Sequence, residues 1–191
     1  NHSSGVFDFT SNTAWVDSVT VNPGRLWTPE EALNTFLKPS YFSPGNGWKY
    51  SNSNYLLAGL IIEEATGASI SSNLRELILD PLQLERTFFP IEEPWRDSLV
   101  HNWVNNFDLY SYPKTAAYSG IWAAGALYST AENVTRFYKS LFDLEIINQI
   151  SLNQMLTRLP TTIGVEYGLG IMSYNLAGRN KFMHDGDWWG F

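Results

Sequence analysis

Two short polar segments of this 191-residue sequence carry residue types that could do chemistry. The first is Tyr50-Ser51-Asn52, which stands directly before the most regular helical pattern of the chain. Polar groups at a helix N-terminus are held rigidly, and the helix dipole favours an anionic partner there. A tyrosine in this place could act as a general base if a cation stabilised its phenolate. From this tripeptide alone a simpler interpretation is favoured, in which Ser51, Asn52 or Ser53 caps the helix and Tyr50 is a packed aromatic residue.

The second segment is His184-Asp185-Gly186, at the end of a predicted strand. A glycine in a strand permits the close approach of another backbone or of a ligand. The alternative is a strand-end histidine in an ordinary turn. Taken alone, neither segment identifies a function.

The remaining composition argues against several classes of protein and site. The chain has no cysteine, which removes disulfides, thiol catalysis and cysteine-based metal sites. Its three histidines have no His-x-x-x-His spacing, so we expect no metal site and no cofactor. There is no Gly-x-Ser-x-Gly elbow and no phosphate-binding loop. A formal net charge of −7 argues against a nucleic-acid partner. No apolar run approaches the roughly 20 residues of a membrane span.

Several helices must position the two polar segments. The capping box Thr28-Pro29-Glu30-Glu31 predicts a helix to about residue 37. Residues 53–65 form the strongest predicted helix, because apolar side chains recur on one face and Gly67 follows as a left-handed cap. The expected inner side chains of that helix are Leu56, Leu57, Leu60 and Ile61.

Further helices are predicted over residues 69–79, over 130–142 and from Ser151 onward, whereas 1–25 and most of 82–128 are expected to be irregular. Capping boxes at Ser129 and Ser151 open the last two helices, and the expected inner residues of the 130–142 helix are Val134, Phe137, Tyr138 and Leu141. Residues 167–174 and 181–186 are predicted to form two strands joined by a turn that contains Gly178. The predicted class is α+β, with a mainly helical region over 1–160 and a sheet hairpin over 161–191.

Five sequence blocks, in order, extend over nearly the whole chain. They are Asn1-His2-Ser3-Ser4-Gly5, Pro44 to Gly67 with Tyr50-Ser51-Asn52 inside it, Asp80-Pro81-Leu82 with Thr87-Phe88-Phe89-Pro90, Ala123 to Ala131, and Tyr167-Gly168-Leu169-Gly170 with His184-x-Gly186. Together they resemble the serine β-lactamase and penicillin-binding-protein superfamily. The likeness is greatest to its branch of class C β-lactamases, D-alanyl-D-alanine carboxypeptidases, D-aminopeptidases and related esterases. The resemblance implies a β-lactamase/DD-peptidase-like fold, of which this chain would hold the helical region and one hairpin of an incomplete antiparallel sheet.

The resemblance also implies a serine nucleophile in a Ser-x-x-Lys motif upstream of the block that begins at Asn1, so we expect the chain to be an internal fragment that is inactive by itself. Ser111-Tyr112-Pro113-Lys114 fits the motif as letters, but it falls between the second and third motifs, which is the wrong order. By the same resemblance, the protein would be periplasmic or secreted, and its expected partner is a small-molecule or peptide substrate.

The expected roles follow from the family and concern an acyl-enzyme mechanism. Tyr50 would exchange protons with the nucleophile and the leaving group, and Asn52 would bind the substrate amide or steady the lysine. His184 would replace the lysine of the third β-lactamase motif, which favours a D-peptidase or an esterase over a β-lactamase. Asp185 and Gly186 would contact substrate, with backbone N–H groups of this strand forming half of an oxyanion hole. Tyr50, Asn52 and His184 are therefore expected to meet at one cleft, with Ser111 outside it.

Two other interpretations compete with a hydrolase. A non-catalytic relative that binds peptides or cell wall would keep the cleft and lack the nucleophile. A carbohydrate-binding module would use the eight tryptophans and ten tyrosines as a sugar platform. Such modules are usually all-β, so the helix content discriminates against that second alternative.

Overall fold

The structure, a computed structural model, describes residues 1–94 and 99–187. The helices are α1 (Thr13–Val21), α2 (Pro29–Phe36), α3 (Ser53–Thr66), α4 (Ile70–Leu74), α5 (Thr115–Ile121), α6 (Ala131–Phe142) and α7 (Gln149–Met155). Short 3-10 helices cover Phe9–Ser11 and Trp122–Ala124, and a π-helical turn over Arg75–Leu79 continues α4. The strands are β1 (Trp103–Val104), β2 (Phe107–Asp108), β3 (Leu159–Pro160), β4 (Glu166–Tyr167), β5 (Met172–Leu176) and β6 (Arg179–Met183).

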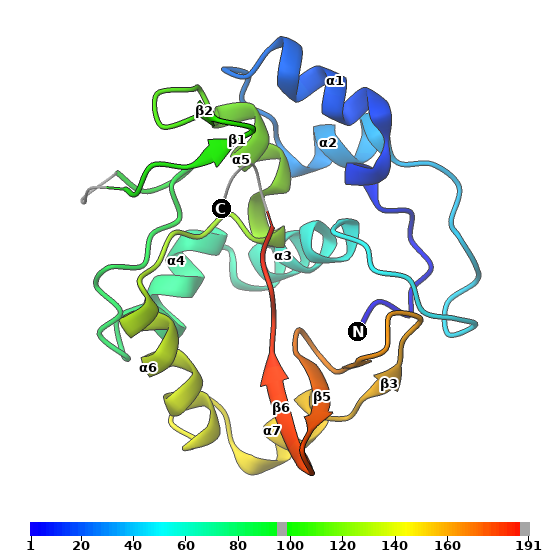
Figure 1. Ribbon diagram of the computed structural model, residues 1–191, viewed down its shortest axis with the longest axis vertical. Coiled ribbons are helices and arrows are strands. Elements are labelled where there is room, and N and C mark those ends of the chain that lie inside the picture. The colour runs from blue at the N-terminus through cyan, green and yellow to red at the C-terminus, as the bar shows by residue number, and fades with distance from the viewer. Residues whose placement is uncertain (95–98, 188–191) are drawn as a thin grey trace.

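Helix α3 crosses the middle of the molecule, between the α1–α2 pair and the sheet (Figure 1). Leu56 on this helix is fully buried. The absence of a side chain at Gly59 lets helix α3 approach the ring of Trp122, because a Cβ at Gly59 would lie only 2.5 Å from that ring. The predicted inner face is wrong in part, because Leu57 is 37% and Ile61 67% exposed. The middle of α3 is apolar on nearly all sides, so its periodicity could not select the buried face.

The aromatic core lies beneath α1 and α2, where Trp15 is the central side chain. Its ring contacts Phe9, Trp27 and Phe36 at centroid distances of 5.1, 6.1 and 5.4 Å, all edge to face. Residues 1–25 are therefore not the loop that was expected. Asn12 caps α1 by accepting from the N–H of Ala14, and this cap was the signal that the sequence offered.

The other predicted helices form with small shifts. The Thr28 capping box is present, and α6 follows the predicted range. Thr130, not Ser129, caps α6, and Val134 is 44% exposed while Leu141 is buried as predicted. Helix α7 begins at Gln149 behind the cap Asn148, two positions before the predicted start. Within 82–128, α5 was missed, since its small residues carry no amphipathic pattern.

The sheet is an antiparallel meander in the order β3-β4-β5-β6, so it holds more than the single predicted hairpin. The predicted strand over 167–174 is broken at Gly168 and Gly170, which leaves Tyr167 on β4. The predicted strand over 181–186 ends early, at Met183, because Met183 pairs with Met172, the first residue of β5. Over the described residues, β6 forms an outer edge of the sheet, as expected.

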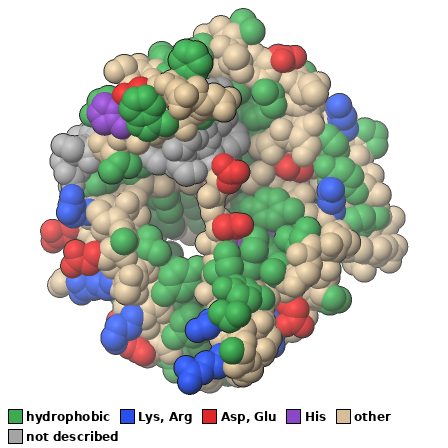
Figure 2. Space-filling view, in the orientation of Figure 1, with side chains coloured by type: hydrophobic (Ala, Val, Ile, Leu, Met, Phe, Trp, Pro, Cys, Tyr) green, Lys and Arg blue, Asp and Glu red, His purple; other side chains and the backbone are tan. Residues whose placement is uncertain are grey.

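The accessible surface is larger than the chain length suggests. The accessible area is 11250 Å², whereas a compact monomer of this mass exposes about 9200 Å². Figure 2 shows hydrophobic side chains gathered over β5 and β6 on one face. In the described part of the chain, no helix has both the length and the apolarity that crossing a bilayer requires. The helical content contradicts the carbohydrate-module alternative.

Candidate active site

Tyr50-Ser51-Asn52 leads directly into α3, and acceptors from the first residues of the chain hold this segment. The N–H of Ser51 donates to Nδ1 of His2 at 3.1 Å, and the N–H of Asn52 donates to Oδ1 of Asp8 at 3.1 Å. Asn52 makes no side-chain cap bond of its own. The simple capping interpretation is therefore wrong for Asn52, because His2 and Asp8 accept the N–H groups that precede the helix.

The side chain of Asn52 is oriented by two bonds of its amide nitrogen. Nδ2 donates to Thr10 Oγ1 at 3.1 Å and to Asp8 Oδ1 at 3.4 Å. Both partners accept, so the amide is fixed with its nitrogen toward them and its oxygen on the other side. Oδ1 is therefore left as an acceptor for a cation or for an amide N–H.

Tyr50 is half-buried between two histidines. Its ring stacks on His2 with centroids 4.1 Å apart and lies 6.3 Å from the ring of His184. Burial, followed by the charges of Tyr55, Asp8 and Asp185, raises the pKa of Tyr50 to about 12. The hydroxyl therefore keeps its proton at neutral pH and can donate it. It becomes a general base only where a cation lowers this pKa.

His184 follows β6 directly and is fixed through both ring nitrogens. Nδ1 lies 2.7 Å from the carbonyl oxygen of Asp185, which can only accept, so Nδ1 carries a proton. In the neutral ring, Nε2 is then the acceptor of the 2.7 Å bond from the hydroxyl of Tyr167. Tyr167 is fully buried and has a side-chain hydrogen bond with Tyr55 on α3. The hydroxyls of Tyr55 and Tyr167 thus connect α3 to His184 through hydrogen bonds.

Asp185 and Gly186, the expected substrate contacts, are both exposed. A Cβ at Gly186 would meet nothing within 4 Å, so no described group requires a glycine there. The charge of Asp185 acts on both Tyr50 and Tyr167, which places it beside the site. Because β6 ends at Met183, the segment expected to supply half of an oxyanion hole is not part of the sheet.

Two serines of the chain, Ser111 and Ser51, are unsuited to act as nucleophiles here. Ser111 is exposed in a turn after β2, and Nζ of Lys114 donates to the carbonyls of Leu109 and Tyr110 at 2.6 and 3.1 Å, so Lys114 is not available to it. Ser51 is fully buried. The described residues hold no group of three or more metal-ligating side chains.

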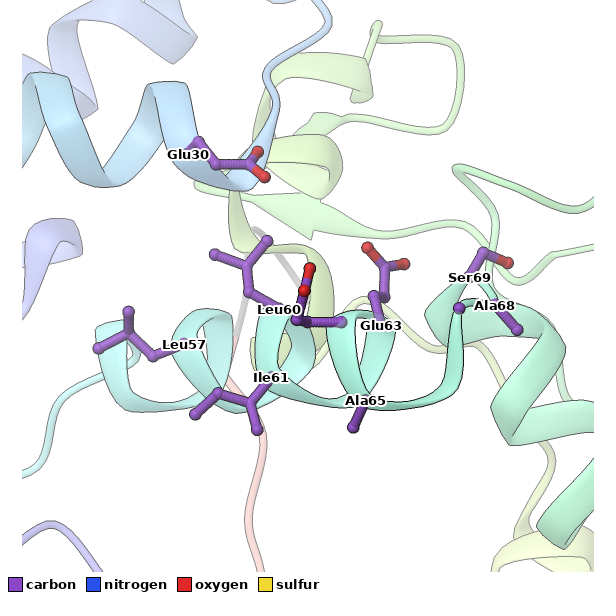
Figure 3. Close-up of a pocket in the computed structure, with 10 residues that line it drawn as sticks. Glu30, Leu57, Leu60, Ile61, Glu63, Ala65, Ala68 and Ser69 are labelled. Carbon is purple, nitrogen blue, oxygen red and sulfur yellow. The ribbon is translucent and has the colours of Figure 1, made fainter.

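A separate pocket of about 870 Å³ opens beside α3 and does not include Tyr50, Asn52 or His184. Glu30 of α2 faces it, and Leu60 and Glu63 project from α3 toward Glu30, while Ile61 and Ala65 project the other way (Figure 3). This pocket and the polar cluster are therefore different places, whereas another pocket, of about 590 Å³, is lined in part by Gly186.

The predicted meeting of Tyr50 and His184 is confirmed by their 6.3 Å ring separation. The sequence analysis missed His2, Asp8 and Tyr167 as partners of this cluster. His2 and Tyr167 stand in blocks that carried the resemblance, and Asp8 had no signal beyond its carboxylate. The catalytic and substrate-binding roles stay predictions.

Comparisons with known proteins fit this arrangement. The chain is similar in structure to a D-stereospecific amidohydrolase from Streptomyces sp., with a TM-score of 0.88 and 26% identity, covering 100% of this chain and 60% of that one. It is also similar to a D-amino acid amidase from Ochrobactrum anthropi SV3, with a TM-score of 0.80 and 28% identity, covering 96% and 54%. In sequence it is 28% identical to a teichoic acid D-alanine hydrolase from Staphylococcus aureus over 59% of this chain.

The chain spans 28% of the length of that curated hydrolase and 60% of the Streptomyces structure. The described fold is of the β-lactamase/DD-peptidase type, an α+β architecture with antiparallel sheets. The family model described as Beta-lactamase matches residues 1–191, and the chain therefore belongs to the beta-lactamase family.

Proposed function

We propose that these residues form the tyrosine, asparagine and histidine part of the active site of a serine hydrolase that cleaves an amide or ester bond next to a D-amino acid. The observation that carries this proposal is the meeting of Tyr50 and His184 beside the N-terminus of α3. The names of the three relatives given above refer to activity on D-configured substrates.

In the proposed reaction, the hydroxyl of the family's Ser-x-x-Lys serine attacks the substrate carbonyl and loses its proton to a base. An acyl–oxygen bond forms, and the bond to the leaving group breaks as that group takes up a proton. Tyr50, which holds its proton at neutral pH, would deliver that proton and would regain one from the base that took up the serine proton. Water then attacks the acyl-enzyme and releases the acid, which returns the serine to its starting state.

Asn52 and His184 would orient rather than react. Oδ1 of Asn52 is aimed away from its anchors and can accept from the substrate amide or from the lysine. His184 stands where the third motif of β-lactamases has a lysine, and both of its ring nitrogens already have hydrogen-bond partners, the carbonyl of Asp185 and the hydroxyl of Tyr167. Together with the negative Asp185, this favours amides and esters over substrates with a free terminal carboxylate.

The proposal is tested with a chimera in which residues 1–191 replace the matching 60% of the Streptomyces amidohydrolase. We expect the folded chimera to be acylated by a fluorophosphonate probe and to hydrolyse D-amino acid amides and p-nitrophenyl esters. The 191-residue chain alone should take up no probe, since Ser111 has no free lysine beside it.

A Ser111→Ala chimera is the matched control and should label like its parent. Probe uptake at Ser111 in the chain alone would contradict the proposal that the nucleophile is the family's Ser-x-x-Lys serine. A folded chimera that binds D-amino acid amides without labelling or turnover would instead support the non-catalytic binding relative.

A further inference from the structure

His2 fixes the backbone around Tyr50, the proton donor of the proposed mechanism. Its carbonyl oxygen accepts from the N–H of Lys49 at 3.1 Å, and its Nδ1 accepts from the N–H of Ser51 at 3.1 Å. The backbone is thus fixed on both sides of Tyr50 by one residue. His2 is 2% exposed and adopts a left-handed φ of 63°, a conformation that is uncommon for residues other than glycine.

The ring of His2 also contacts both Tyr50 and Tyr167. It stacks on Tyr50 at a centroid distance of 4.1 Å and an interplanar angle of 30°. Its edge faces the ring of Tyr167, with a centroid distance of 4.7 Å and an interplanar angle of 78°. The hydroxyl of Tyr167 is in turn hydrogen-bonded to His184. The imidazole therefore supports Tyr50 from one side, beside the direct contacts of Tyr50 with Tyr167 and His184 at centroid distances of 6.2 and 6.3 Å.

A chain of hydrogen bonds fixes which nitrogen of His2 is the acceptor. The N–H of Val6 donates to Ser4 Oγ at 3.1 Å, so the Ser4 hydroxyl donates to Asn54 Oδ1 at 2.6 Å. The amide nitrogen of Asn54 then faces His2 and donates to Nδ1 at 3.2 Å. Two donors converge on Nδ1, which must carry no proton. Burial also lowers the pKa of His2 to about 4, so the ring is neutral at physiological pH.

We propose that His2 is a positioning residue, whose neutral imidazole aims the hydroxyl of Tyr50 at the reacting groups through a backbone acceptor bond and a ring stack. This inference rests on the proposed function for the role of Tyr50, but the geometry that it asserts can be measured without turnover. His2 itself does not contact the substrate.

Two substitutions at His2 test the backbone acceptor bond and the ring stack separately. His2→Phe keeps a ring against Tyr50 and removes the acceptor, whereas His2→Asn keeps a side-chain oxygen near the place of Nδ1 and removes the ring. In the 191-residue chain with labelled tyrosines, the Tyr50 resonances are assigned with Tyr50→Phe. We expect His2→Phe to weaken the nuclear Overhauser contacts between Tyr50 and His184, and His2→Asn to retain part of them.

His101 provides the matched control, because it is exposed and stacks on Tyr110 with centroids 4.3 Å apart. His101→Phe and His101→Asn should leave the Tyr50 resonances unchanged. Unaltered Tyr50–His184 contacts in both folded His2 variants would overturn the proposal. Unfolding of both His2 variants while the His101 variants stay folded would also overturn it, since His2 would then be a structural residue.

In the chimera, His2→Phe should lower kcat on the order of 100-fold, as expected for a displaced catalytic group, with KM little changed. His2→Asn should recover part of that loss. A chimera that is inactive before any substitution would contradict the proposed function, whereas the magnetic resonance result would still decide the role of His2.

Discussion

Replacing Tyr50 by phenylalanine lowers kcat of the chimera by about 10²–10⁴-fold, the usual contribution of a positioned general acid or base. The substitution removes one hydroxyl from a half-buried ring and leaves the stack on His2 in place. The fold should therefore persist, and the loss should fall on kcat and kcat/KM together, because the proton transfer occurs only in the transition state. Single-turnover and steady-state kinetics with a D-amino acid amide, whose amine leaving group must take up a proton, measure acylation and turnover separately.

Tyr174→Phe is the control for the loss of a tyrosine hydroxyl, since Tyr174 is 37% exposed on β5 and has no part in the site. This variant should turn over like the parent chimera. Equal turnover in the Tyr50→Phe and Tyr174→Phe chimeras would remove Tyr50 from the mechanism.

Replacing Trp15 by alanine costs about 3–5 kcal/mol in the free energy of unfolding, the range for removing a large buried aromatic side chain. Trp15 is 1% exposed and contacts three other aromatic rings. A Cβ at Gly120 would overlap its ring at 1.9 Å, so the ring fills its site completely and α5 would lose a packing partner. Urea unfolding followed by circular dichroism gives the free energy directly.

Val16→Ala is the matched control on the same helix, because Val16 is 49% exposed. It should change the free energy of unfolding by no more than about 0.5 kcal/mol, as is usual for surface positions. If Trp15→Ala and Val16→Ala destabilised the chain equally, the aromatic core would not be placed as described.

The sequence predicted best those elements whose ends are marked by local chemistry. The capping box at Thr28 and the left-handed Gly67 each involve a few neighbouring residues, so the sequence alone located both. Where tertiary packing decides, prediction failed. The buried face of α3 depends on what Leu56 and Gly59 contact across the fold, and the length of β6 depends on where β5 begins.

The residues of the candidate site also fall into those that local sequence could predict and those that depend on tertiary packing. Tyr50, Asn52 and His184 were found because they stand in motifs, and their roles came from family resemblance and not from spacing. His2 and Tyr167 act through contacts with residues far away in the sequence, such as His2 with Ser51 and Tyr167 with His184. Such contacts leave no local pattern, so only the folded arrangement could reveal them.

The exposed apolar side chains of α3 and the large accessible surface also affect how the chain responds to temperature and denaturant. The change in heat capacity on unfolding and the slope of stability against denaturant both scale with the surface newly exposed. A folded state that already exposes more surface than its mass predicts has less left to expose. The stability of these 191 residues should therefore vary gently with temperature, along a flatter curve than that of a compact protein of equal length.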